Sequence, residues 1–156
     1  MTDIRAKERA IVTLTSTGGS MTNSSAAAAG TDFDVRASGN AADDLQAQFE
    51  LTCQWATVTG IVNGTIAAEL YLLPKMDGTT LPTFDNTSGA AVLPAACFVG
   101  TFICTKTPTA NTNMIFVTPT IDISPRLYTA YLRNRSGQAI SANWTLKVVS
   151  DQAQTV

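Results

Sequence analysis

The sequence predicts an all-β protein, folded as an antiparallel β-sandwich of about eight strands. Residues 45–55, LQAQFELTCQW, alternate apolar and polar side chains without exception, as a strand with one buried face and one solvated face does. Turn-forming residues recur at the spacing typical of sandwiches, about 8–12 residues. No segment has the apolar spacing of an amphipathic helix. Among sandwich topologies we favour a jelly roll, with an immunoglobulin-like sandwich as the alternative.

The composition fits extended strands that carry short neutral polar side chains. Of the 156 residues, 45% are hydrophobic, whereas only 14% are charged, well below the usual share of about 25%. A chain of this length is most simply one domain. We therefore expect a single sandwich over residues 10–150, an exposed polar arm at residues 1–9 and a free polar tail at residues 151–156.

The first third of the chain is predicted to hold two strands. Residues 9–16 alternate between two partly apolar faces and end at a pair of glycines. Residues 20–30, SMTNSSAAAAG, have too little side-chain volume to fill a core, so we expect a loop or a segment ordered only against a neighbour. A short strand is expected within residues 31–36, and residues 38–44 form a polar turn.

The middle of the chain is predicted to hold three strands. Residues 66–73 form the first, which places three apolar side chains on one face, namely Ala68, Leu70 and Leu72. A long connection then runs to about residue 89. Residues 97–104 form the second strand, with Phe98 and Phe102 on the same face. Residues 114–118 form the third and shortest strand.

The last third is predicted to end in a β-hairpin. Residues 121–125 form an extended linker, because the residue before a proline avoids the helical region. The arms of the hairpin are residues 126–134 and 140–149, joined by the turn sequence RSGQA. We expect Trp55 and Trp144 to be buried, one from each side of the core.

The sequence argues against catalysis. It contains no histidine, which removes Ser-His-Asp and Cys-His chemistry and histidine-ligated zinc. Its three cysteines show no CxxC spacing and lie in apolar strand patterns, so we interpret Cys53, Cys97 and Cys104 as small buried hydrophobes. An acidic group could supply oxygen ligands to calcium but lacks the Asp-x-Asp-x-Asp-Gly pattern: Asp32, Asp34, Asp43 and Asp44. We predict a protein that is not an enzyme and has no cofactor or metal.

Charge and hydropathy limit the partners. A formal net charge of −2 gives no broad basic field, so we expect no nucleic-acid partner. The most apolar window, residues 89–104, is interrupted by Pro94 and Gly100 and is shorter than the roughly 20 residues that span a bilayer, so we expect no membrane partner. The N-terminal residues lack the apolar stretch of a signal peptide, so we expect synthesis in the cytoplasm.

Two groups of residues are candidates for binding another protein. The basic residues of the N-terminal arm could contact an acidic surface, or could simply be solvated. The polar face of residues 45–55 carries a row of amides suited to hydrogen bonds across an interface or to water, with Glu50 its one strong acid or base. The predicted interface residues are Arg5, Lys7, Arg9, Gln46, Gln48 and Gln54.

Three segments carry a resemblance to a known class of protein. They are TLTSTGGSMTNSSAAAAG at residues 13–30, AELYLLPKMDGTT at residues 68–80 and YLRNRSGQAISANWTLKVV at residues 131–149. In these segments the chain resembles the small β-sandwich virion proteins of tailed bacteriophages, especially capsid decoration or cement proteins.

The resemblance implies a structural protein on the outside of the capsid, made in the host cytoplasm. Such a protein is often a homotrimer and binds neighbouring subunits of the major capsid protein. A tail-fibre or adhesin module that binds a glycan is one alternative, although its loop tips would be expected to carry aromatics, and here they carry mostly Thr, Asn, Ser and Pro. A small carbohydrate-active enzyme is the other, weakened by the absent histidine and the lack of an obvious carboxylate pair.

Overall fold

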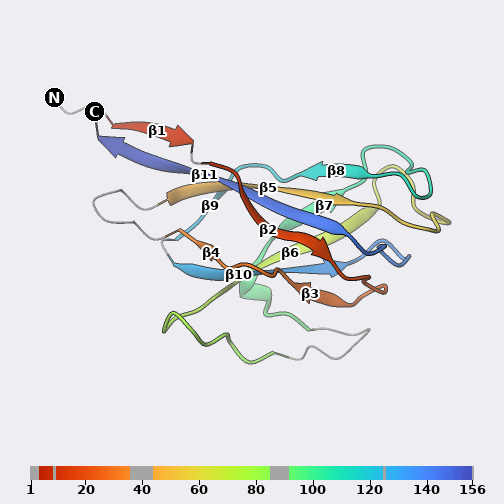
Figure 1. Cartoon of the computed structure of the whole chain (residues 1–156), viewed down its shortest axis with the longest axis horizontal. Helices are drawn as coiled ribbons and strands as arrows, with labels where there is room; N and C mark the ends of the chain where they lie inside the picture. The colour runs from red at the N-terminus through yellow and green to blue at the C-terminus, as the bar shows by residue number, and fades with distance from the viewer. Residues whose placement is uncertain (1–3, 9, 36–43, 85–91, 125, 156) are drawn as a thin grey trace.

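The computed structural model describes residues 4–8, 10–35, 44–84, 92–124 and 126–155. In these residues the chain forms two antiparallel β-sheets packed face to face, which confirms the predicted all-β sandwich (Figure 1). The helical structure in the described residues is a single 3-10 turn, η1 (Ala95–Cys97).

One sheet has β11 and β5 at its centre. β1 and β2 follow one edge of β11, β5 pairs with its other edge, and β8 and β9 follow the far edge of β5. We call it the six-stranded sheet, formed by β1 (Ile4–Glu8), β2 (Val12–Gly18), β5 (Asp44–Cys53), β8 (Met114–Val117), β9 (Ile121–Asp122) and β11 (Trp144–Thr155).

The second sheet has β10 and β6 at its centre. β3 and β4 follow one edge of β10, and β7 closes the far side of β6. This five-stranded sheet is formed by β3 (Ala26–Ala28), β4 (Phe33–Asp34), β6 (Ile66–Pro74), β7 (Phe98–Ile103) and β10 (Leu127–Asn134). Three pairs of short strands each share one position in a sheet: β1 with β2, β3 with β4, and β8 with β9. When each pair is counted as one interrupted strand, the described chain has eight strand positions. Numbered along the chain, these positions are ordered 1-8-3-6 in the six-stranded sheet and 2-7-4-5 in the five-stranded sheet.

The main core lies between the sheets, and the alternation of β5 supplies much of it. Its apolar side chains at Ala47, Phe49, Leu51 and Cys53 are at most 2% exposed, as the period of two predicts. Burying a Phe or Leu fully contributes about 1.5–3 kcal/mol. Two tryptophans, Trp55 and Trp144, are also buried, but they extend β5 and begin β11, which belong to the same sheet. The prediction of one tryptophan from each side is therefore wrong.

A second, smaller apolar cluster lies on the outer face of the five-stranded sheet. Its buried members are Tyr71, Leu73, Leu93 and Tyr131, with Leu81 and Phe84 packed against them. The described residues of the connection between β6 and η1, namely 75–84 and 92–94, contribute Leu81, Phe84 and Leu93 to this cluster (Figure 1). β6 and β10 are consequently buried on both faces over much of their length.

The predicted hairpin of residues 126–149 is wrong, because β10 and β11 belong to different sheets. The connection between them is anchored in the core. Asn134 is fully buried, and its Nδ2 donates to the carbonyl oxygens of Met21 at 2.9 Å and Gln138 at 2.7 Å. Ile140 is also fully buried and pairs with Met21 and Trp55. These contacts carry the chain from one sheet to the other.

The prediction that Phe98 and Phe102 share a face is also wrong. β7 pairs Phe98 with Tyr71 and Gly100 with Leu70, and the register shifts between these pairs. Such a bulge adds one residue and turns the following side chains over. Phe102 is therefore buried in the main core, whereas Phe98 is 46% exposed, with its ring 5.5 Å from that of Tyr71.

The predicted arm and tail pair with each other. β1 forms an antiparallel ladder with residues 151–155 of β11, at the end of the six-stranded sheet near both termini (Figure 1). The backbone hydrogen bonds of the ladder hold both segments, so neither the arm nor the tail is a free extension of the sandwich. The alanine run is likewise ordered, because β3 pairs with Tyr131, Leu132 and Arg133 of β10. Of the two alternatives for this run, the neighbour-ordered segment is correct.

Four short predicted segments can be compared with the structure. The strand predicted over residues 9–16 is β2, which begins at Val12, and the expected linker contains the short strand β9. The strand expected within residues 31–36 is β4. The expected polar turn falls outside the described residues apart from Asp44, which begins β5.

Candidate functional site

The polar face of β5 lies on the outer face of the six-stranded sheet, but its side chains are bonded within that sheet. The Nε2 of Gln46 donates to Asp122 Oδ1 at 2.9 Å, and the Nε2 of Gln48 donates to the carbonyl oxygen of Thr118 at 3.0 Å. The Nζ of Lys147 donates to Glu50 Oε1 at 3.0 Å. The two glutamines are thus positioned at this surface, with one amide donor of each already used.

The structure brings the N-terminal strand close to Gln46. Glu8 of β1 pairs with Asp151 of β11, which pairs in turn with Gln46. Arg5 and Lys7 stand opposite Gln154 and Gln152 in the same ladder, and Arg9 lies outside the described residues.

Gln54 lies at the other end of β5, away from the β1 ladder. Its backbone oxygen accepts a hydrogen bond from Ser141 at 2.9 Å, and its side chain is half-buried. The six predicted interface residues therefore do not form one compact group.

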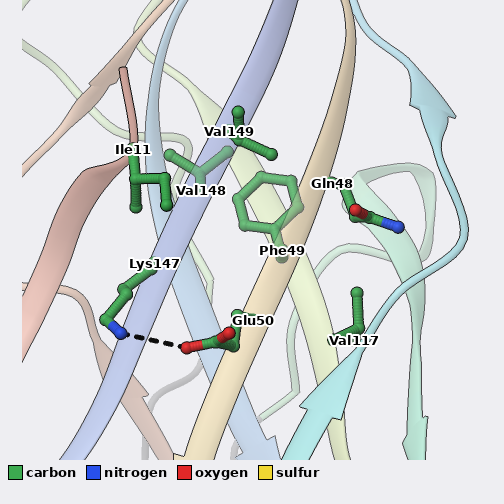
Figure 2. A pocket seen from close by; sticks show the side chains of 8 residues that line it. All are labelled: Ile11, Gln48, Phe49, Glu50, Val117, Lys147, Val148 and Val149. Atoms are coloured by element: carbon green, nitrogen blue, oxygen red, sulfur yellow. Dashed lines mark hydrogen bonds and ion pairs between the residues drawn. The ribbon is translucent and has the colours of Figure 1, made fainter. Parts of the chain in front are cut away.

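Apolar side chains on the same outer face were missed by the sequence analysis. Ile11, Ile115 and Val117 are 66%, 64% and 54% exposed. Ile11 and Val117 lie on opposite sides of a shallow depression of about 200 Å³ over β11 and β5, as Figure 2 shows. The sequence pattern could have predicted two of them, since Ile115 and Val117 alternate with the buried Met114 and Phe116.

The depression has aliphatic side chains along its sides and an ion pair of zero net charge at one end. Val149 lies between Ile11 and Gln48, and the ion pair between Lys147 and Glu50 closes the end (Figure 2). Because the pair neutralises both charges, the surface presents aliphatic groups without a net charge. Such a surface suits contact with another apolar surface, and its acid and its base, Glu50 and Lys147, are paired with each other.

The acidic residues near β4 are arranged for structure. Asp32 accepts hydrogen bonds from Lys75 Nζ and Thr129 Oγ1, both at 2.6 Å, and joins the β3–β4 segment to β6 and β10. Partial burial raises the pKa of Asp32, but these hydrogen bonds and the charge of Lys75 outweigh burial and lower the pKa below its usual value. No group of three or more potential metal ligands of the His, Cys, Asp or Glu type occurs among the described residues, and Asp43 lies outside them.

The three cysteines are free thiols. Cys53 and Cys104 are fully buried, and burial together with the neighbouring Cys104 raises the pKa of Cys53 to about 12. Burial also raises the pKa of Cys104 and of the half-buried Cys97. At neutral pH these thiols are protonated, the form that is a poor nucleophile and a poor metal ligand.

Among the described residues, no helix is long and apolar enough to cross a membrane. Comparison of the sequence with known protein families finds no match, and comparison with curated proteins finds no significant similarity.

Proposed function

We propose that this chain is a non-catalytic structural protein of a virion. In this proposal it sits on the exterior of the capsid as a decoration protein and binds neighbouring subunits of the major capsid protein. The observation that carries the proposal is the exposed apolar outer face of the six-stranded sheet, with Ile11, Ile115 and Val117 each more than half exposed.

The contrast between the two outer faces supports this assignment. The chain's own connection packs on the five-stranded sheet at Tyr71 and Tyr131, whereas Ile115 and Val117 stay open to solvent. Contiguous apolar patches on soluble proteins commonly mark interaction sites. A protein that covers this face would bury the aliphatic side chains beside the ion pair of Lys147 and Glu50. Because these two charges already neutralise each other, no unpaired charge would lose its contact with water.

We also propose the jelly roll as the topology within the sandwich class. The strand orders 1-8-3-6 and 2-7-4-5 support it, because each sheet alternates strands from both ends of the chain, as two intertwined Greek keys would. Jelly rolls occur in viral capsid proteins and lectins. The fold is therefore compatible with the virion proposal, but a fold alone does not determine function. The homotrimeric state and the location on the virion rest on the resemblance described above.

The test is binding to purified capsids, measured by co-sedimentation. We expect Val117→Lys to weaken binding at least about tenfold, because it places a charge in the proposed contact. Val62→Lys is the matched control, since Val62 and Val117 are both 54% exposed and Val62 lies in the connection before β6. Equal binding by the two variants would show that the six-stranded sheet is not the contact face, and no binding by the wild type would refute the capsid role.

One observation favours the alternative of a glycan-binding adhesin module. Phe98 is an exposed aromatic, 46% accessible, held edge-on against Tyr71. Exposed aromatic rings can stack on sugar faces. A glycan-array signal that is lost in Phe98→Ala, together with no capsid binding, would favour the adhesin.

A further inference from the structure

A charged cluster lies on the outer face of the five-stranded sheet, beside the second apolar cluster. Along the β6–β10 ladder, Tyr71 pairs with Tyr131 in the apolar cluster, and the next outward-facing pair is Glu69 with Arg133. Arg135 follows at the end of β10 and joins the same group. We call Glu69, Arg133 and Arg135 the arginine cluster.

In the arginine cluster, two cations share one carboxylate. Glu69 Oε1 lies 3.3 Å from Arg135 Nε, and Glu69 Oε2 lies 3.9 Å from Arg133 Nη1. The other ion pairs of the described residues set one cation against one carboxylate, as Lys75 does with Asp32. The arginine cluster therefore carries one excess positive charge in a chain whose formal net charge is −2.

The carboxylate of Glu69 is also engaged by a third group. The hydroxyl of Tyr71 donates to Glu69 Oε2 at 3.0 Å. Burial, with the hydrogen bond to Glu69, raises the pKa of Tyr71, so the phenol stays protonated and remains a donor. Glu69 thus accepts a hydrogen bond from a phenol and forms ion pairs with two guanidinium groups, and it cannot saturate the donors of both arginines.

Donors of the arginines are left unused. A guanidinium has five N–H donors, and the buried Nε of Arg133 has no acceptor among the described residues. The Nε of Arg133 is itself shielded from solvent, so a ligand would reach the cluster through the exposed parts of the two side chains, which are 23% exposed for Arg133 and 42% exposed for Arg135.

We propose that Arg133 and Arg135 bind the carboxylate group of a small ligand. The planar fork of a guanidinium matches the two oxygens of a carboxylate. One carboxylate would neutralise the single excess charge, whereas phosphate, with a charge of about −1.5 to −2, would place extra negative charge beside Glu69. The site lies on the opposite sheet from the proposed capsid contact and does not depend on that function.

The test uses the Arg Nε–H signals of the full-length protein in a proton–nitrogen NMR spectrum. Sodium acetate is titrated as the probe, with sodium chloride at equal ionic strength as the control. We expect saturable shifts of the Arg133 and Arg135 signals with acetate that chloride does not reproduce. Arg126, which is exposed and lies outside the cluster, should show no saturable shift.

Variants distinguish a built site from general attraction of anions. Arg135→Gln should weaken acetate binding about tenfold, which is the loss expected for one hydrogen bond to a charged group. Because the side chain of Arg135 is 42% exposed, we expect this variant to fold. Glu69→Gln should tighten binding, because it removes the competing carboxylate. Lys147→Gln, at the ion pair of the other sheet, should leave the titration unchanged.

The proposal is overturned if acetate and chloride give the same shifts, or if Arg135→Gln titrates like the wild type. It is also overturned if phosphate binds the wild type more tightly than acetate, because the charge argument would then be wrong. A thermal melt of each variant confirms that the folded protein was titrated.

Discussion

Gly18 is predicted to be a position where a single added methyl group disrupts the core. It ends β2 and lies against the buried indole of Trp144, and a Cβ built on Gly18 would overlap the atoms of that ring. The next residue, Gly19, has open space at its Cβ position. Two adjacent glycines thus provide a test and a control at nearly the same place in the chain.

The expected cost of Gly18→Ala follows from two opposing effects. Replacing glycine by alanine stabilises by about 0.4–1 kcal/mol through the unfolded state where the backbone permits it. Overpacking costs about 1–3 kcal/mol, and displacing Trp144 would also strain the 2.7 Å hydrogen bond from its Nε1 to the carbonyl oxygen of Gly19, worth about 1 kcal/mol. We expect a net destabilisation of about 1–3 kcal/mol, or a fall in Tm of roughly 2–12 °C for a domain of this size.

The assay is urea denaturation followed by tryptophan fluorescence, with a thermal melt in parallel. Gly19→Ala should be as stable as the wild type or more stable, by up to about 1 kcal/mol. If Gly18→Ala proves as stable as Gly19→Ala, the packing of Trp144 against β2 is wrong.

Three further predictions concern the core and the buried groups. Ser136→Ala removes the acceptor of the 2.9 Å hydrogen bond from Trp55 Nε1, and it should lower the free energy of unfolding by about 1–3 kcal/mol in urea denaturation; a neutral result would contradict that contact. Asp32→Asn should flatten the loss of stability on acidification. Because the pKa of Asp32 is lowered in the folded protein, the ionised carboxylate stabilises the fold above about pH 4, and this stabilisation is lost as the pH falls through the folded-state pKa. The measurement is the urea midpoint of wild type and variant at pH 6 and pH 3. An equal fall in midpoint for both proteins would contradict the role of Asp32. With a thiol-reactive dye at neutral pH, Cys97 should react first, and Cys53 and Cys104 only on unfolding; equal rates for all three would disagree with their burial.

The sequence was sufficient to predict the fold class and the strand faces that depend on local alternation. β5 is the clearest case, because its period of two needs no information from elsewhere in the chain. The pairing of β10 and β11 could not be predicted in this way. The sequence RSGQA indicates a reversal, but the buried contacts of Asn134 and Ile140 with Met21 decide that the chain crosses between sheets. Those partners lie more than 110 residues apart in sequence.

Of the candidate site on the six-stranded sheet, the sequence predicted the polar half but not the apolar half. Gln46 and Gln48 were correctly placed on a polar face, but their hydrogen bonds go to Asp122 and Thr118, whose position depends on how β8 and β9 pair with β5. The apolar half, at Ile115 and Val117, joins that face only once this register is known. Register is a long-range property, and a shift of one residue would have buried these side chains.

The two proposals occupy opposite sheets, and this separation follows from how the chain uses its longest connection. Residues 75–84 and 92–94 supply Leu81, Phe84 and Leu93 to the outer face of the five-stranded sheet, so part of that face is already an interior. The charged margin at Arg133 and Arg135 stays accessible there, and it suits a small anion better than a flat partner. The six-stranded sheet keeps aliphatic side chains exposed at Ile11, Ile115 and Val117, where we propose that the capsid binds. Val117→Lys and Arg135→Gln should therefore each weaken one binding activity without affecting the other.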